Sequence, residues 1–150
     1  AYNTAIEDYK KTYGIVLPES AKLMTSSFSK YDANVDTMGN EMSMQYHTDF
    51  IISERDMPGP KFLLTCTTYI NDDYEGGDIE FYIGDEYYPY KPKAGDILVF
   101  PSTEPYFHGV RVIKNGEKFF IRNFIQHIFD GTPEWLANQK HFGVVFTLGP

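Results

Sequence analysis

The chain has 150 residues and a net charge of −8, and we expect residues 1–150 to fold as a single domain with a sizeable core. The negative charge argues against a broad nucleic-acid-binding surface, which needs clustered lysine and arginine. No apolar run approaches the roughly 18 residues that span a bilayer, so we expect no membrane partner. The lone Cys66 cannot form an internal disulfide, and this favours a reducing, cytoplasmic location.

Helix signals are confined to the ends of the chain. "TAIEDYKKTYG" predicts a short helix over residues 5–13, with Thr4 and Glu7 in capping-box spacing and Gly14 as the stop. "LPESAKLM", residues 17–24, predicts one or two further helical turns. Near the C-terminus, "TPEWLANQK" predicts another helix, because proline is favoured at a first helical position.

Between the terminal helices the sequence predicts strands joined by glycine- and proline-rich turns. The runs "EMSMQYHTDF", "KFLLTCTTYIN", "DIEFYI", "ILVF", "RVI" and "KFFIRNFIQHIF" have strand character, and "KNGE" predicts a hairpin turn. No long helix separates these runs, so parallel βαβ units are not expected. The prediction is a mainly β sandwich or barrel.

Two connecting segments have alternative interpretations. "FIISERDMPGP" suits either a mobile loop over a site or a plain hairpin connection. Tyr87, Tyr88 and Tyr90 in "DEYYPYKP" suit either the wall of a peptide groove or packing along a sheet edge.

A histidine and an aspartate lie two residues apart in "MQYHTDF". In an extended strand His47 and Asp49 project from the same face, together with Gln45. His108, after the proline-containing loop "PSTEPYF", is a candidate third ligand. Two imidazoles and one carboxylate form the facial triad that holds Fe(II) and leaves positions open. Taken alone, this pattern also suits a solvated strand face, and His108 also suits an ordinary loop position.

Two cations share a face of the last predicted strand. Lys118, Phe120 and Arg122 follow the two-residue period, and an unpaired buried charge is unfavourable. A bound dicarboxylate would supply the partner through charge-assisted hydrogen bonds. The alternative is a solvated face on which both cations pair with surface acids.

Four motifs in order resemble the prolyl-4-hydroxylase-like branch of the 2-oxoglutarate and Fe(II)-dependent dioxygenases. They are "YHTDF", "TTYINDDYEGGDIEFY", "KPKAGDILVF" and "HGVRVIKNGEKFFIRNF", and they fall within about residues 40–125. The resemblance implies a double-stranded β-helix, a jelly-roll or cupin-like barrel with the metal inside one mouth and a few short flanking helices.

The resemblance also implies roles for individual residues. It assigns Fe(II) ligation to His47, Asp49 and His108. It places Lys118 at the position of the basic residue that binds the far carboxylate of 2-oxoglutarate, and it makes Tyr69 a pocket residue.

The sequence departs from the family pattern in three places. Many relatives have a small hydroxyl residue where this chain has Phe120. Arg122 lies on the face of Lys118 and is a second candidate to take or share the carboxylate role. The segment before His47 is short for the family. His127 and His141 are not expected to be ligands, and Cys66 is expected to be a core thiol.

The activity that the resemblance implies is dioxygenation. Fe(II), 2-oxoglutarate and O₂, with ascorbate as a candidate auxiliary, would hydroxylate a substrate C–H bond and release succinate and CO₂. Peptidyl proline is the expected substrate, and the alternatives are a free amino acid, another side chain or a small metabolite. A non-catalytic cupin-like ligand-binding module is the competing class, since it needs neither the triad nor Lys118.

Overall fold

The computed structural model describes residues 1–17, 19, 21–24, 26–33, 41–50, 59–129 and 145–147. The chain begins with a helix, α1 (Tyr2–Tyr13), and continues in strands. The strands are β1 (Lys22–Leu23), β2 (Ser27–Asp32), β3 (Met42–His47), β4 (Gly59–Tyr69), β5 (Glu75–Gly76), β6 (Ile79–Ile83), β7 (Glu86–Tyr90), β8 (Ile97–Pro101), β9 (Phe107–Arg111), β10 (Ile113–Asn115), β11 (Glu117–Phe129) and β12 (Val145–Thr147). Within the described part of the chain, no helix reaches the length and apolar character that crossing a bilayer requires.

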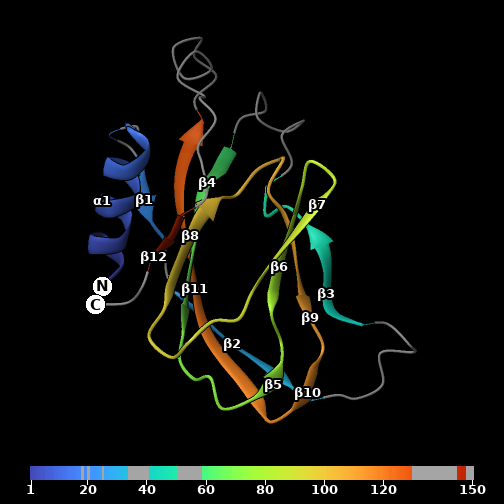
Figure 1. The fold of residues 1–150 in the computed structure, drawn as a ribbon. Helices are drawn as coiled ribbons and strands as arrows, with labels where there is room; N and C mark the ends of the chain where they lie inside the picture. The colour runs from blue at the N-terminus through green and yellow to red at the C-terminus, as the bar shows by residue number, and fades with distance from the viewer. Residues whose placement is uncertain are drawn as a thin grey trace.

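Two antiparallel sheets form the body of the molecule (Figure 1). The larger sheet has the order β1-β11-β4-β8-β12, and β2 also pairs with β11. The smaller sheet has the order β3-β9-β6-β7. The mainly β prediction is therefore confirmed. Apart from the β6–β7 pair, neighbouring strands in both sheets are non-consecutive in the chain, as in a rolled barrel.

The central strand β8 is buried because it is covered on both faces. Ile97 and Val99 pack with residues of α1 on the outer side of the larger sheet, while Leu98 and Phe100 pack between the sheets. Figure 1 shows α1 beside the larger sheet and away from the smaller one. A strand covered on both faces reads as a continuous apolar run, which explains "ILVF". Cys66 belongs to the helix-side cluster, as expected, and burial raises its pKa to about 12.

The N-terminal predictions are partly confirmed. Gly14 ends α1 with a left-handed φ of 63°, as expected. The helix starts earlier than predicted, however, and its N-cap, Ala1, makes no side-chain cap hydrogen bond. Glu7 instead pairs with Lys10 at 2.8 Å. The predicted capping box is therefore wrong, because Thr4 lies inside the helix rather than at its start.

The predicted helical turn over residues 17–24 is also wrong where the chain is described. Lys22 and Leu23 form β1 and pair with Gln126 and Ile125 of β11. Backbone hydrogen bonding to this long strand overrides a local helical preference. The helix predicted in "TPEWLANQK" lies outside the described residues, as do most of "FIISERDMPGP" and His141.

One strand pairing differs from the prediction, and one strand was not predicted. β10 does not form a hairpin with β11 but pairs with β5, with Ile113 opposite Gly76. "DEYYPY" contains a strand, β7, which is an edge of the smaller sheet as described. Tyr87 and Tyr88 are exposed on it, and Pro89 is tolerated because edge strands need not donate every N–H. This position agrees with the sheet-edge interpretation of the tyrosines.

Candidate metal centre and pocket

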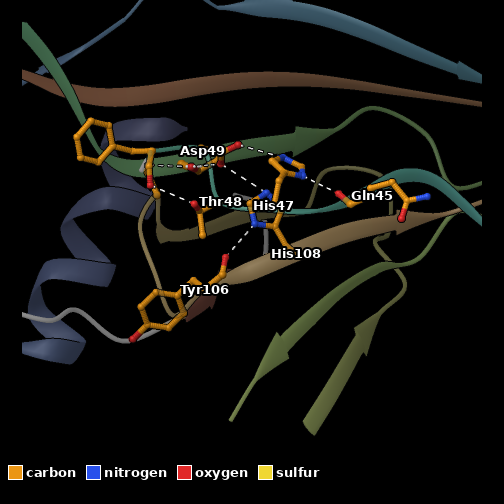
Figure 2. A network of polar contacts seen from close by, with 9 residues as sticks. Gln45, His47, Thr48, Asp49, Tyr106 and His108 are labelled. Atoms are coloured by element: carbon orange, nitrogen blue, oxygen red, sulfur yellow. Dashed lines mark hydrogen bonds and ion pairs between the residues drawn. The ribbon is translucent and has the colours of Figure 1, made fainter. Parts of the chain in front are cut away.

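Two histidines and an aspartate meet where β3 ends beside β9. His47 and His108 are opposite each other in the β3–β9 pair, and Asp49 follows two residues after β3 ends. His47 Nε2 lies 3.4 Å from Asp49 Oδ1, and His108 Nε2 lies 3.5 Å from Asp49 Oδ2. One ligand atom from each residue fits within 4.8 Å of the others. Figure 2 shows the carboxylate of Asp49 beside the two rings, with a dashed line to each of them.

An irregularity in β3 aims His47 into the barrel. The β3–β9 register shifts between Met44 and His47, and both residues line the same pocket. A regular two-residue period would set Met44 on the face opposite His47, so the alternation is broken at this bulge. Gly109 permits the close approach, since a Cβ there would lie 2.6 Å from Met42 Cε and 2.8 Å from the Met44 carbonyl oxygen.

Backbone carbonyls orient both imidazole rings. His47 Nδ1 lies 2.8 Å from the Gln45 carbonyl oxygen, and His108 Nδ1 lies 3.1 Å from that of Tyr106 (Figure 2). A carbonyl oxygen only accepts, so each Nδ1 carries the hydrogen and donates it. In the neutral ring the Nε2 lone pair is then free, and it points toward the shared space at Asp49.

In the metal-free triad, hydrogen bonds favour the ionised form of Asp49 and the protonated form of His47. Burial alone would raise the pKa of Asp49, but hydrogen bonds from His108 and His47 outweigh burial and hold that pKa well below its ordinary value. The hydrogen bond to Asp49 raises the pKa of His47, and partial desolvation opposes this rise. A divalent cation would replace the protons at this site and satisfy the same carboxylate.

A pair of buried hydroxyls fixes the second oxygen of Asp49. Thr65 Oγ1 donates to Asp49 Oδ2 at 2.6 Å, and Ser102 Oγ lies 2.9 Å from Thr65 Oγ1. Thr65 has one hydroxyl hydrogen and donates it to the carboxylate of Asp49, so Ser102 must be the donor to Thr65. Both residues are fully buried. This chain of hydrogen bonds holds Oδ2 of Asp49 in place and leaves Oδ1 available to bind a metal ion.

We expect Thr65→Val to weaken metal binding by roughly 10–100-fold, the usual effect of losing a partner that orients a metal ligand. Valine keeps the branched shape but cannot donate to Asp49. Titration of metal-free protein with Fe(II) under anaerobic conditions measures the affinity, and Thr65→Ser, which restores the hydroxyl, is the matched control. Equal affinity in Thr65→Val and the unsubstituted protein would contradict this role.

The triad opens into a pocket between the sheets. Its empty space is about 410 Å³, open solvent at its mouth included. Aromatic, hydroxyl, imidazole and cationic side chains line it: Tyr31, Met44, His47, Thr65, Thr67, Tyr69, Ile79, Phe100, His108, Val110, Lys118, Phe120 and Arg122. Lys118, Phe120 and Arg122 all face this pocket, so the shared face predicted for β11 is confirmed.

Lys118 is a buried cation on the pocket wall. Its side chain is 1% exposed, and Nζ donates to the Gly77 carbonyl oxygen at 2.6 Å. The positive φ of Gly77, 71°, is part of the turn that presents this carbonyl, and a Cβ there would lie 2.3 Å from Ile113 Cδ1. Burial, followed by the nearby charge of Lys91, lowers the pKa of Lys118 to about 7. A ligand carboxylate would restore the charged form.

The remaining sequence-predicted residues also have defined places. Tyr69 lines the pocket, and Lys118 Nζ lies 5.1 Å from the centre of its ring. Arg122 lies further along β11 and also lines the pocket. His127 is buried on β11 but does not line this pocket. The structure therefore brings His47, Asp49 and His108 together and sets the two cations on the wall beside them.

A family model matches the residues that build this site. The model of the 2OG-Fe(II) oxygenase superfamily matches residues 29–126, more than half of the chain. The chain belongs to this superfamily. The matched segment runs from β2 to β11 and so contains the triad, the glycine turn and both pocket cations.

Curated relatives of this superfamily member include PKHD-type hydroxylases. The protein is 28% identical over 126 residues to one from Picosynechococcus sp. PCC 7002, which covers 83% of this chain and 48% of the relative. It is 33% identical over 72 residues to one from Prochlorococcus marinus NATL1A, which covers 47% of this chain and 32% of the relative. The chain thus spans about half the length of the first relative and less of the second.

Solved structures with this fold include prolyl hydroxylases. A truncated form of the viral collagen prolyl hydroxylase from Paramecium Bursaria Chlorella virus-1 has a TM-score of 0.63 at 17% identity, covering 85% of this chain and 65% of that one. The Pseudomonas putida prolyl-4-hydroxylase has a TM-score of 0.51 at 19% identity, covering 68% and 51%. These likenesses confirm the double-stranded β-helix fold.

Sequence reasoning missed three contributors to the site, Thr65, Ser102 and Met44. Thr65 and Ser102 look like ordinary strand and loop residues, and only the fold sets them against Asp49. Met44 was missed because a regular two-residue period sets it on the face opposite His47. A threonine inside an apolar strand, "LLTCT", is a weak sign of a buried hydroxyl that needs a partner.

Proposed function

We propose that this protein is a 2-oxoglutarate- and Fe(II)-dependent dioxygenase that hydroxylates a C–H bond of its substrate. One observation supports this above all: His47 and His108 of the cluster with Asp49 line the same pocket as the buried Lys118. A generic ligand-binding barrel needs neither a three-sided metal site nor a cation buried beside it. Membership of the superfamily supports the same chemistry.

The donor set fits Fe(II). Two imidazole Nε2 atoms with their Nδ1–H groups tied to carbonyls, and one carboxylate, are the ligands of non-haem Fe(II) oxygenases. We propose that His47, Asp49 and His108 hold the metal. When bound, iron with 2-oxoglutarate and O₂ supplies the oxidant for the C–H bond, and succinate and CO₂ are the coproducts.

The pocket wall would orient the cosubstrate. We assign its far carboxylate to Lys118, whose ammonium would form a charge-assisted hydrogen bond there. Tyr69 packs beside this lysine and helps to exclude water from the ion pair. Phe100 and Phe120 contribute apolar surface around the reacting centre. The chain's own task is thus to bind, orient and keep dry the reactants.

The substrate we assign first is peptidyl proline. Prolyl hydroxylases with the same fold support this assignment. A free amino acid, another side chain or a small metabolite would suit the same metal site. The test incubates the protein with Fe(II), 2-oxoglutarate and ascorbate and screens proline-containing peptides and free amino acids by mass spectrometry. We expect a gain of one oxygen in a substrate.

Removing one metal ligand is expected to stop cosubstrate turnover. In His47→Ala we expect conversion of 2-oxoglutarate to succinate to fall by more than the roughly 10–100-fold that loss of an orienting partner causes. Lys93→Gln is a suitable control because Lys93 is exposed and lies outside the pocket. Succinate is measured by chromatography. Equal metal-dependent turnover in His47→Ala would remove the enzyme assignment and favour the cupin-like binding module.

A further inference from the structure

We propose that Arg122 is a second carboxylate-binding residue in the pocket, and that the carboxylate it binds belongs to the substrate. This inference depends on the proposed function and narrows it. The substrate would be a free amino acid, or a peptide that places a carboxylate beside the hydroxylated carbon. Internal peptidyl proline without a neighbouring acid would not meet this requirement.

Arg122 and Lys118 occupy different levels of the same wall. Both face the pocket from β11, four residues apart, which corresponds to about 13 Å between Cα atoms in an extended strand. Arg122 pairs with Thr67 of β4, two residues from the Thr65 that binds Asp49. Arg122 therefore lies on the wall of the pocket that His47 and His108 also line.

The guanidinium of Arg122 has no matching anion in the described part of the chain. No ion pair or hydrogen bond joins it to any described residue, and its Nε is buried without a partner. Arg111 shows the contrasting case, since its Nη2 and Nε contact Glu80 at 2.7 and 3.1 Å. An unpaired cation beside a pocket is unfavourable unless a ligand completes it.

The geometry around Arg122 suits a planar anion. Its guanidinium carbon lies 5.5 Å from the ring centre of Phe124, which supports the cation through its aromatic face. A guanidinium presents paired donors that match the two oxygens of a carboxylate. The proposed function already assigns the far carboxylate of 2-oxoglutarate to Lys118. Arg122 remains for the substrate.

The test compares matched acid and amide probes on the anaerobic complex with Fe(II) and 2-oxoglutarate. One set pairs free L-amino acids with their amides, and the other pairs proline-containing peptides that carry Asp or Asn beside the proline. We expect one or more acids to bind at least about tenfold more tightly than the matched amides, as a lost charge-assisted hydrogen bond implies. A preference for the acid in the first set would identify a free amino acid as the substrate, and a preference in the second set would identify a peptide.

Substitution then assigns the preference to Arg122. Arg122→Gln should abolish the acid preference while leaving the Kd of 2-oxoglutarate within about twofold, and Arg122→Lys, which keeps the charge but not the paired donors, should retain part of it. Lys93→Gln should change neither. Intact 2-oxoglutarate binding also shows that each variant is folded.

Two outcomes overturn the inference while the proposed function stands. One is 2-oxoglutarate binding and turnover with no acid preference for any probe pair. The other is weaker 2-oxoglutarate binding in Arg122→Gln without a change in the probe preference, which would move Arg122 to the cosubstrate. Absence of 2-oxoglutarate binding in the unsubstituted protein would instead refute the proposed function itself.

Discussion

Replacing Asp49 with asparagine is expected to abolish iron binding and cosubstrate turnover while the metal-free fold persists. Asp49 supplies the carboxylate of the triad, and its side chain is 6% exposed between His47 and His108. An amide oxygen is a neutral and weaker ligand, so the site loses the negative charge that balances the metal. Turnover should fall well beyond the roughly 100-fold that marks loss of an orienting partner.

The metal-free fold should survive because asparagine nearly matches aspartate in shape. Its side-chain oxygen still accepts from Thr65, while the attraction that lowers the pKa of Asp49 is lost. Iron binding is measured by anaerobic titration and folding by thermal unfolding of the metal-free protein. Glu41→Gln is the matched control, since Glu41 is an exposed acid that pairs with Arg111. Stoichiometric, tight iron binding by Asp49→Asn would contradict the proposed ligand set.

The strands near the site were predictable because local pattern and burial agree there. The apolar run "ILVF" reflects the two-sided burial of β8. "EMSMQYHTDF" was predicted as a strand and contains β3, although burial along β3 does not alternate. These local patterns do not predict which strands pair with each other. β10 pairs with β5 rather than β11, and Lys22–Leu23 join β11 as β1, because long-range backbone hydrogen bonds decide both.

The metal cluster was predictable in composition but not in detail. The spacing of His47 and Asp49, with His108 as the third candidate, sufficed to name the group that the structure brings within 4.8 Å. The bulge that turns Met44 into the same pocket could not be read from a two-residue period. Thr65 was missed for a related reason, since a hydroxyl on a buried strand gains its meaning from the residue packed against it.

The two pocket cations show where sequence reasoning ends. Period-2 spacing correctly set Lys118 and Arg122 on one face, but both a solvated and a buried face were compatible with it. In the structure this face lines the pocket, and it is buried at Lys118 and half-buried at Arg122. Lys118 is 1% exposed and donates to a backbone carbonyl, whereas Arg122 is half-buried and its Nε has no hydrogen-bond partner among the described residues. That difference separates the cosubstrate residue from the one we assign to the substrate.

Lys118→Met is expected to weaken 2-oxoglutarate binding by roughly 100-fold and to stabilise the metal-free protein. Methionine fills similar space but cannot pair with the far carboxylate, and a lost charge-assisted hydrogen bond in a buried site has an effect of this size. It also removes a cation whose burial is unfavourable. Isothermal titration with 2-oxoglutarate and thermal unfolding measure the two effects. Unchanged affinity for 2-oxoglutarate would exclude Lys118 as its partner.

The pH dependence of the same variant gives an independent check. Burial lowers the pKa of Lys118 from 10.5 to about 7, so between these values the unfolded chain holds a proton that the folded chain lacks. Stability should therefore rise with pH over this window, by up to about 1.4 kcal/mol per pH unit, and the unfavourable charge is fully present below pH 7. Lys118→Met should lose this dependence.

Cosubstrate binding should show the opposite trend. The bound carboxylate requires a charged ammonium, so above pH 7 binding takes up a proton at Lys118, and affinity for 2-oxoglutarate should fall by up to about tenfold per pH unit. Isothermal titration calorimetry with 2-oxoglutarate at pH 8, in two buffers of different ionisation enthalpy, measures the number of protons taken up on binding. In Lys91→Met the pH at which affinity for 2-oxoglutarate begins to fall should be higher, because the charge of Lys91 helps to lower the pKa of Lys118. Proton uptake that persists in Lys118→Met would assign the titration to another group.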